Sequence, residues 1–126
     1  YPFRIDFFGD EIDYKSGVAM AASLARSSLG ATAVVAAADI LAIGAVRGFY
    51  DAGLRVPEDM SIIGFDDLEI SQYLAPGLTT IRQQISLKGQ RAVELLLEHI
   101  ADPSLSKQEE ILPLKLIERG SVRKLS

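Results

Sequence analysis

The sequence predicts an α/β fold in which a mostly parallel sheet is covered by helices, as in a parallel-sheet three-layer sandwich. Short apolar runs typical of buried strands alternate with longer segments whose apolar residues recur at helical spacing. Glycine and proline residues punctuate these segments, so that the predicted order is β-α-β-α-β followed by β-α-β. The 126 residues fit one domain or a piece of a larger one.

The first half of the chain contains two strand patterns and one helix pattern. Residues 3–7 alternate apolar and polar side chains, which predicts a strand with one buried face. Apolar residues recur at helical spacing over residues 18–29, and Gly30 stands where a helix C-cap is expected. Residues 32–37 form a short apolar run that suits a strand covered on both faces.

A second helix is predicted over residues 40–52, with Asp39 as its N-cap and Gly53 at its end. One of its apolar stripes, which suits packing on a sheet, comprises Leu41, Ala42, Ala45 and Phe49. Another stripe comprises Ile43, Val46 and Tyr50. The second stripe indicates either a subunit contact or a broad face turned to the core. Gly44 and Gly48 lie four apart, a spacing that favours close packing.

The second half continues the alternation. The run over residues 60–65 reads as a buried strand that ends at Asp66 and Asp67, and residues 67–78 look irregular. Residues 79–81 suit a short strand, and Ser86 is expected to cap a helix over residues 86–101. Residues 111–117 predict a last strand, which Pro113 favours at the edge of the sheet.

Composition excludes several classes of function. With 13 basic and 17 acidic side chains and a net charge of −4, the chain lacks the basic footprint of a nucleic-acid binder. The absence of cysteine excludes disulfides and thiolate metal sites and fits a reducing compartment. No apolar run reaches the ~20 residues of a membrane span. The chain starts at Tyr1 with no visible signal peptide, and we expect it to be a fragment.

Three acids follow predicted strands: Asp39 after the second, and Asp66 with Asp67 after the third. Because ligands of open α/β sheets bind at the carboxyl ends of strands, these acids are candidates for a site. Converging carboxylates could hold Mg²⁺ in a phosphoacceptor domain, but the acid pair comes late in the strand order for that class. Of the three acids, Asp66 is the one for which a purely structural role, such as capping a helix or shaping a loop, is least evident. It is therefore the strongest candidate for binding a ligand.

No catalytic constellation is visible. His99 is the only histidine and has no Ser or Cys partner at a suggestive position. Metal-ligand spacing, a nucleophile elbow and a Gly-rich phosphate loop are all missing from the sequence. The sequence therefore predicts no catalytic residues, no metal site and no cofactor, and favours a binding module over an enzyme.

Several motifs in fixed order resemble the lactose/galactose-repressor family of bacterial transcription regulators. They lie at residues 37–45, 53–67, 76–83, 89–97 and 112–119. The resemblance is strong from Thr32 to Arg119 and weaker before Gly30. It implies a two-lobed sensor of the periplasmic-binding-protein-like type I fold, in which a small effector binds between the lobes. The effector modulates DNA binding by a separate helix-turn-helix domain.

The resemblance also implies that residues 1–126 are the carboxyl-terminal part of the sensor, with an incomplete second lobe and no DNA-binding domain. The helix over residues 86–101 would pack with the missing first lobe. The expected partners are a sugar or purine-like effector, a second copy in a homodimer, and DNA only through the missing domain. The expected location is the cytoplasm, with no membrane contact.

Candidate ligand-binding residues carry over from the resemblance one at a time. Asp66 matches the family acid that hydrogen-bonds the effector, and Gln83 matches a polar hinge residue near the pocket. Ala38 stands where sugar-responsive members often have Asn, and Asp39 follows it. Ile12 stands where the family places a stacking aromatic, for which Phe8 or Tyr14 could substitute.

The family resemblance gives the second stripe of the helix over residues 40–52 a role in a two-fold subunit contact. The predicted contact residues are Ile43, Val46, Tyr73 and Leu74. The preferred interpretation is an effector-sensing portion of a transcription regulator. Two alternatives stay open: a periplasmic sugar-binding protein for transport and, with less support, the Mg²⁺-dependent phosphoacceptor domain.

Overall fold

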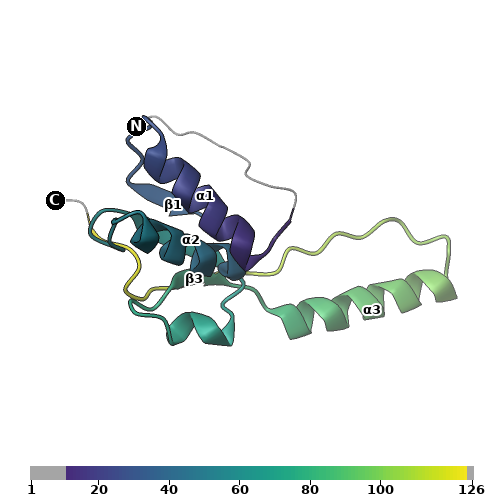
Figure 1. Cartoon of the computed structure of the whole chain (residues 1–126). Coiled ribbons are helices and arrows are strands. Elements are labelled where there is room, and N and C mark those ends of the chain that lie inside the picture. Colours follow the sequence, from purple (N-terminus) through teal and green to yellow (C-terminus); the bar gives the residue numbers. More distant parts are fainter. Residues whose placement is uncertain (1–10, 125–126) are drawn as a thin grey trace.

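The computed structural model describes residues 11–124, so the strand predicted over residues 3–7 lies outside the described part. Four strands form one mixed sheet in the order β1-β2-β3-β4, in which the first three are parallel and β4 is antiparallel to β3. The elements, shown in Figure 1, are α1 (Tyr14–Arg26), β1 (Ala33–Val35), α2 (Asp39–Asp51), β2 (Ser61–Phe65), the 3₁₀ helix η1 (Glu69–Gln72), β3 (Thr79–Arg82), α3 (Ile85–Ala101) and β4 (Lys115–Ile117). The α/β class is confirmed.

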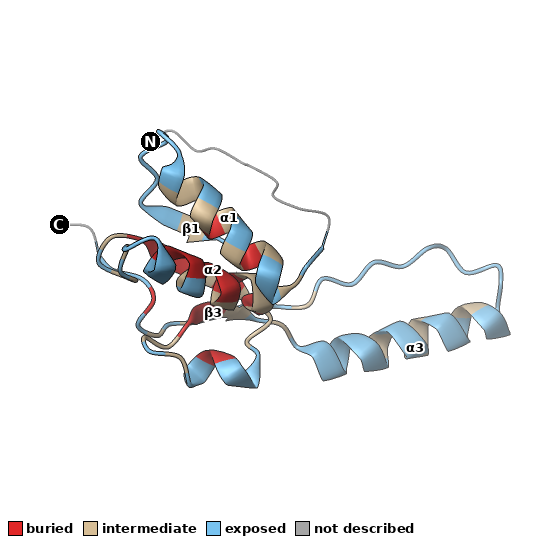
Figure 2. Cartoon of the chain, viewed as in Figure 1, coloured by how far each residue is buried: buried red, intermediate tan, exposed pale blue. Residues whose placement is uncertain are grey.

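The core lies between α1, α2 and the sheet, where Figure 2 shows the buried segments. Its buried apolar residues are Ala21, Ala36, Ala42, Ala45, Phe49, Met60, Ile62 and Leu78. The stripe predicted to face the sheet supplies three of them, because α2 lies against β2. The predicted close packing is also found, since a Cβ at Gly44 would overlap the Tyr14 carbonyl oxygen of α1.

The start and end of α1 differ from the prediction. The helix begins at Tyr14 because the Asp13 carboxylate accepts a hydrogen bond from the Ser16 amide at 2.7 Å, an N-cap that apolar periodicity alone could not reveal. Its C-cap is Ser27, and Gly30 takes its positive φ of 62° in the following turn.

Two predicted helix caps are wrong. At the start of α2, Ala38 occupies the N-cap position and Asp39 is the first helical residue. The Asp39 side chain turns inward to three other donors, so it cannot serve the amides of its own helix. At the start of α3, Gln84 occupies the N-cap position without a side-chain bond, and Ser86 already lies inside the helix.

Both outer strands are shorter than predicted. β1 covers three residues, and Val35 is 71% exposed because no described segment lies over it, so it is not covered on both faces. β4 starts at Lys115, two residues after Pro113, and takes the expected edge position beside β3. Residues 69–72, predicted as irregular, form η1.

α3 extends away from the rest of the described chain, and a long exposed segment leads back to β4 (Figure 1). None of its residues is buried. Its exposed apolar side chains include Ile85 at the start of the helix and Val93, Leu96, Leu97 and Ile100 further along it.

Candidate functional site

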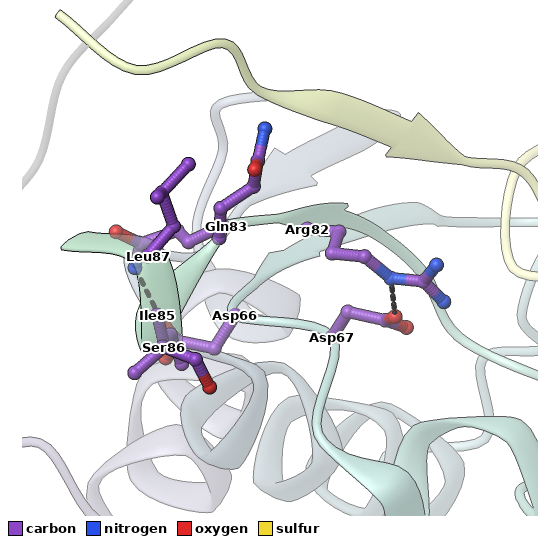
Figure 3. A pocket seen from close by; sticks show the side chains of 8 residues that line it. Asp66, Asp67, Arg82, Gln83, Ile85, Ser86 and Leu87 are labelled. Atoms are coloured by element: carbon purple, nitrogen blue, oxygen red, sulfur yellow. Dashed lines mark hydrogen bonds and ion pairs between the residues drawn. The ribbon is translucent and has the colours of Figure 1, made fainter. Parts of the chain in front are cut away.

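An open hollow lies where β2 and β3 end and α3 begins, and Figure 3 shows the side chains around it. Its lining residues are Asp66, Asp67, Arg82, Gln83, Gln84, Ile85, Ser86 and Leu87. β2 and β3 are parallel, so their carboxyl ends deliver these side chains to the same edge of the sheet. This is the edge at which open α/β sheets bind ligands.

Asp66 and Gln83, which the sequence singles out separately, are in direct contact. Gln83 Nε2 donates a hydrogen bond to Asp66 Oδ1 at 2.7 Å. The Asp66 amide donates to the Ile81 carbonyl at 2.9 Å, which ties the end of β2 to β3. No residue among 11–124 donates to the other carboxylate oxygen, Oδ2. That oxygen can therefore accept a hydrogen bond from a hydroxyl or amine in the hollow.

Asp67 has a different role, because two arginines neutralise its carboxylate. Arg82 Nε lies 2.5 Å from Oδ2 and Arg119 Nη2 lies 2.7 Å from Oδ1 (Figure 3 shows the Arg82 pair). Burial opposes ionisation, but the hydrogen bonds from Arg119 and Arg82 outweigh it and hold the pKa of the Asp67 carboxyl below its ordinary value. The acid thus joins β2, β3 and the segment after β4.

Asp39 is fully buried and does not line the hollow. Its Oδ1 accepts from the Thr80 hydroxyl at 2.5 Å, and its Oδ2 accepts from the Ser71 hydroxyl at 2.5 Å and the Leu68 amide at 2.8 Å. A Cβ at Gly64 would overlap Oδ1, so glycine makes room for the carboxylate. Both oxygens are therefore already engaged within the protein.

The three acids do not converge on one point. Asp66 faces the hollow, Asp67 is held by arginines and Asp39 is enclosed by its own donors. Within residues 11–124, no group of three or more Asp, Glu or His side chains could hold a metal ion.

The remaining ligand-binding candidates lie outside the lining of the hollow. Ala38 is buried at the N-cap of α2, with a methyl group that can neither donate nor accept a hydrogen bond. Ile12 precedes α1 and is 67% exposed, and Tyr14 opens that helix with 42% of its surface exposed. Phe8 lies outside the described residues.

The predicted subunit contact contains two kinds of residue. Ile43, Val46 and Leu74 are only partly buried and pack against the core. Tyr73 is 70% exposed and Tyr50 is 72% exposed, which leaves two large aromatic side chains on the surface of the η1 and α2 region. The apolar stripe is therefore partly a core face and partly a free surface.

Sequence reasoning missed four residues that shape the site: Ser71, Thr80, Arg82 and Arg119. Arg82 directly follows a predicted strand, so its place at the sheet edge offered a signal. Ser71 and Thr80 offered none, because their hydroxyls act on an acid more than thirty positions away in the chain.

Comparison with known proteins identifies a family with an α/β fold of this kind. The family model of the periplasmic binding protein-like domain matches residues 6–122. The chain belongs to this family.

Among curated relatives, this periplasmic-binding-protein-like domain is 38% identical to the ribose operon repressor of Haemophilus influenzae over 113 residues. The match covers 90% of the chain and 34% of that repressor. It is also 44% identical over 94 residues to the transcriptional repressor PurR of Aliivibrio salmonicida, covering 75% of the chain and 28% of PurR. The chain thus spans about a third of the length of these relatives.

Solved structures give the same family. A LacI-family regulator from Enterococcus faecium with bound ribose is 39% identical, with a TM-score of 0.78 over 92% of this chain and 42% of that one. The lac repressor dimer bound to operator and an anti-inducer is 34% identical, with a TM-score of 0.78 over 87% of this chain and 38% of that one. The resemblance to the lactose/galactose-repressor family is confirmed.

Proposed function

We propose that this domain is the carboxyl-terminal part of the effector sensor of a bacterial transcription regulator. A small-molecule effector would bind between this lobe and a first lobe, and would modulate DNA binding by a separate helix-turn-helix domain. Three relatives that are 34% to 44% identical to this chain are named as repressors, which supports this class.

The observation that carries the proposal is the pairing of Asp66 with Gln83 in the hollow. Gln83 donates to one oxygen of the carboxylate, Oδ1, and Oδ2 accepts no hydrogen bond from residues 11–124. An ionised carboxylate is a strong acceptor for hydroxyl donors, and a sugar presents several of them. The Gln83 bond also fixes the rotation of the carboxylate, so less freedom is lost when the effector binds.

Ribose is the first effector to test. Two solved LacI-family structures that are 37% to 39% identical to this chain contain bound ribose. Ala38 is buried outside the lining of the hollow and offers no polar side-chain atom to an effector. Because the family resemblance includes purine-responsive members, purine bases are the second class to test.

We further propose that α3 belongs with the first lobe. Its apolar side chains are exposed in the described part of the chain, and the relatives are about three times as long as this match. Packing of Val93, Leu96, Leu97 and Ile100 against the first lobe would bury them. The hollow lies at the start of α3, so that lobe would also supply the opposite wall of the effector cleft.

The partners proposed for the whole protein follow from this role. It would form a homodimer through the surface around Tyr50 and Tyr73, contact DNA only through a separate domain and work in the cytoplasm without catalysis or a cofactor. No helix among residues 11–124 has the length and hydropathy of a membrane span. A periplasmic sugar-binding protein for transport is the second candidate, because the matched family model describes that fold.

The test is calorimetric titration of the full-length protein with ribose, other sugars and purine bases, repeated with Asp66→Asn. Removing the carboxylate charge should weaken binding of the preferred effector roughly 10- to 100-fold, as expected for a lost charge-assisted hydrogen bond. Glu69→Gln is the control, since it makes the same chemical change on an exposed residue of η1. Equal affinity for Asp66→Asn and the wild type would refute the site.

A further inference from the structure

The backbone that follows β2 adopts an uncommon conformation. Asp66 and Asp67 both have positive φ angles, 113° and 55° respectively. Residues with a Cβ rarely adopt this region, and they remain there only where surrounding contacts hold them. The direction of the Asp66 side chain depends on this backbone, so the groups that hold it also aim the carboxylate.

Three consecutive amides at this turn are held by three different acceptors. The Asp66 amide donates to the Ile81 carbonyl at 2.9 Å, and the Asp67 amide donates to the Thr80 hydroxyl oxygen at 3.3 Å. The Leu68 amide donates to Asp39 Oδ2 at 2.8 Å. Only the first of these bonds continues the regular pairing of the sheet.

The Thr80 hydroxyl can hold the Asp67 amide because Asp39 sets its orientation. A hydroxyl has one proton and two lone pairs, and an ionised carboxylate can only accept. The Thr80 proton therefore points at Asp39 Oδ1, 2.5 Å away, and a lone pair is left for the amide. Asp39 thus acts on the turn twice, once directly at Leu68 and once through Thr80.

The Asp39 side chain has little room to move. It is fully buried at the first turn of α2, and the space beside Oδ1 is closed by Gly64, where even a methyl group would overlap the carboxylate. Thr80 is also fully buried, in the middle of the sheet. Because Asp39 is part of α2 and its carboxylate is held in place, the position of α2 determines the position of the Asp66–Leu68 turn. Asp39 does this although it does not line the hollow.

We propose that Asp39, acting through the Thr80 hydroxyl, is a positioning residue that sets the Asp66–Leu68 backbone and so aims the Asp66 carboxylate at the effector. The inference rests on the proposed function for the role of Asp66. In this proposal Asp39 supports the residue that binds the effector, whereas the sequence indicated Asp39 itself as a ligand-binding candidate.

The test uses substitutions at Thr80 in the full-length protein, since Asp39→Asn can fail to fold. Thr80→Val keeps the shape and removes the hydroxyl, and Thr80→Ser restores it. Thr79→Val is the matched control, because its hydroxyl accepts from the Arg119 amide and does not reach the turn. Each variant is titrated with ribose, in the wild-type and in the Asp66→Asn background.

We expect Thr80→Val to weaken ribose binding about tenfold, and Thr80→Ser and Thr79→Val to change it less than about twofold. In the Asp66→Asn background the effect of Thr80→Val should disappear, because the two residues act in series. An equal weakening in both backgrounds, or wild-type affinity in Thr80→Val, would overturn the proposal.

Amide hydrogen exchange of the ligand-free protein tests the positioning role of Asp39 and Thr80 independently of the effector assignment. Thr80→Val should speed exchange at Asp67 about tenfold, while Thr80→Ser and Thr79→Val leave it near the wild-type rate. If ribose does not bind the wild type, the effector assignment fails and the exchange rates alone decide whether Asp39 and Thr80 hold the turn. Unchanged exchange in Thr80→Val would overturn the positioning role whatever the ligand.

Discussion

Asp66 and Asp67 are adjacent in the sequence and share a left-handed backbone, yet their carboxylates have different environments. Asp66 contacts an uncharged partner, Gln83, and keeps one oxygen for the hollow. Asp67 is enclosed by Arg82 and Arg119, and its side chain is only 6% exposed. A carboxylate with an uncharged partner at the hollow and a carboxylate in a structural ion pair therefore follow each other along the chain.

The lowered pKa of Asp67 predicts a pH dependence of stability. Because its pKa in the folded protein lies below the ordinary value of 3.8, the ion pairs contribute fully above that value and are lost as the pH falls below it. At neutral pH, Asp67→Asn should lower the free energy of unfolding by about 2 kcal/mol, as expected for charge-assisted hydrogen bonds. The difference from the wild type should shrink toward pH 3.

Urea unfolding of the full-length protein between pH 7 and pH 3 measures how the destabilisation by Asp67→Asn depends on pH. Asp51→Asn is the control, because the pair of Asp51 with Arg47 is exposed and should contribute no more than about 0.5 kcal/mol. A loss for Asp67→Asn that stays constant over the whole pH range would contradict the assignment.

At the scale of elements, α1 and α2 pack with their backbones in close contact at glycine positions. Gly17 of α1 lies against Leu41 of α2, and Gly44 lies against Tyr14. This contact fixes the position of α2, whose first residue is Asp39. The helix pair is therefore connected to the Asp66–Leu68 turn through the buried Asp39 carboxylate.

Gly44→Ala should destabilise the protein by about 1–3 kcal/mol, because the added methyl group meets backbone atoms of α1 that cannot move aside without separating the helices. Equilibrium urea unfolding of the full-length protein measures the change. Arg47→Ala, on the exposed side of the same helix, should stay within about 0.5 kcal/mol. Wild-type stability in Gly44→Ala would show that the helices are not in backbone contact.

At the scale of the whole molecule, the described part of the chain leaves large apolar side chains exposed, among them those along α3 and the side chains of Tyr50 and Tyr73. Exposed apolar patches of this kind mark surfaces that contact another lobe or subunit. We propose that a first lobe covers the apolar side chains of α3 and that the two tyrosines lie in a two-fold subunit contact, in which the same surface meets its own copy.

Tyr73→Asp should weaken dimerisation of the full-length protein about 100-fold, or roughly 3 kcal/mol, because the interface would have to bury an unpaired charge from each subunit. Tyr73 is a cleaner probe than Ile43, which packs partly on the core. Sedimentation velocity over a range of concentrations measures the effect. Lys107→Asp, on an exposed residue after α3, is the control, and an unchanged dimer in Tyr73→Asp would refute the contact.

Much of the fold could be predicted because apolar periodicity is a local property. The buried run of β2, the helices α2 and α3, and the strand at Thr79 all lie within a few residues of their predicted bounds. The caps at Asp39 and Ser86 could not be predicted, since whether a side chain caps its own helix depends on competing donors from elsewhere. The same holds for Val35, whose exposure depends on what covers the sheet.

The sequence by itself determined the α/β class, the family and the choice of Asp66 and Gln83, because these rest on short patterns and on motifs in fixed order. Only the tertiary structure decided that Asp66 and Gln83 touch, that Asp67 is neutralised by arginines and that Asp39 holds the turn from behind. The physical reason is that a carboxylate's role depends on the donors around it. For these acids the donors come from residues up to 52 positions away in the chain.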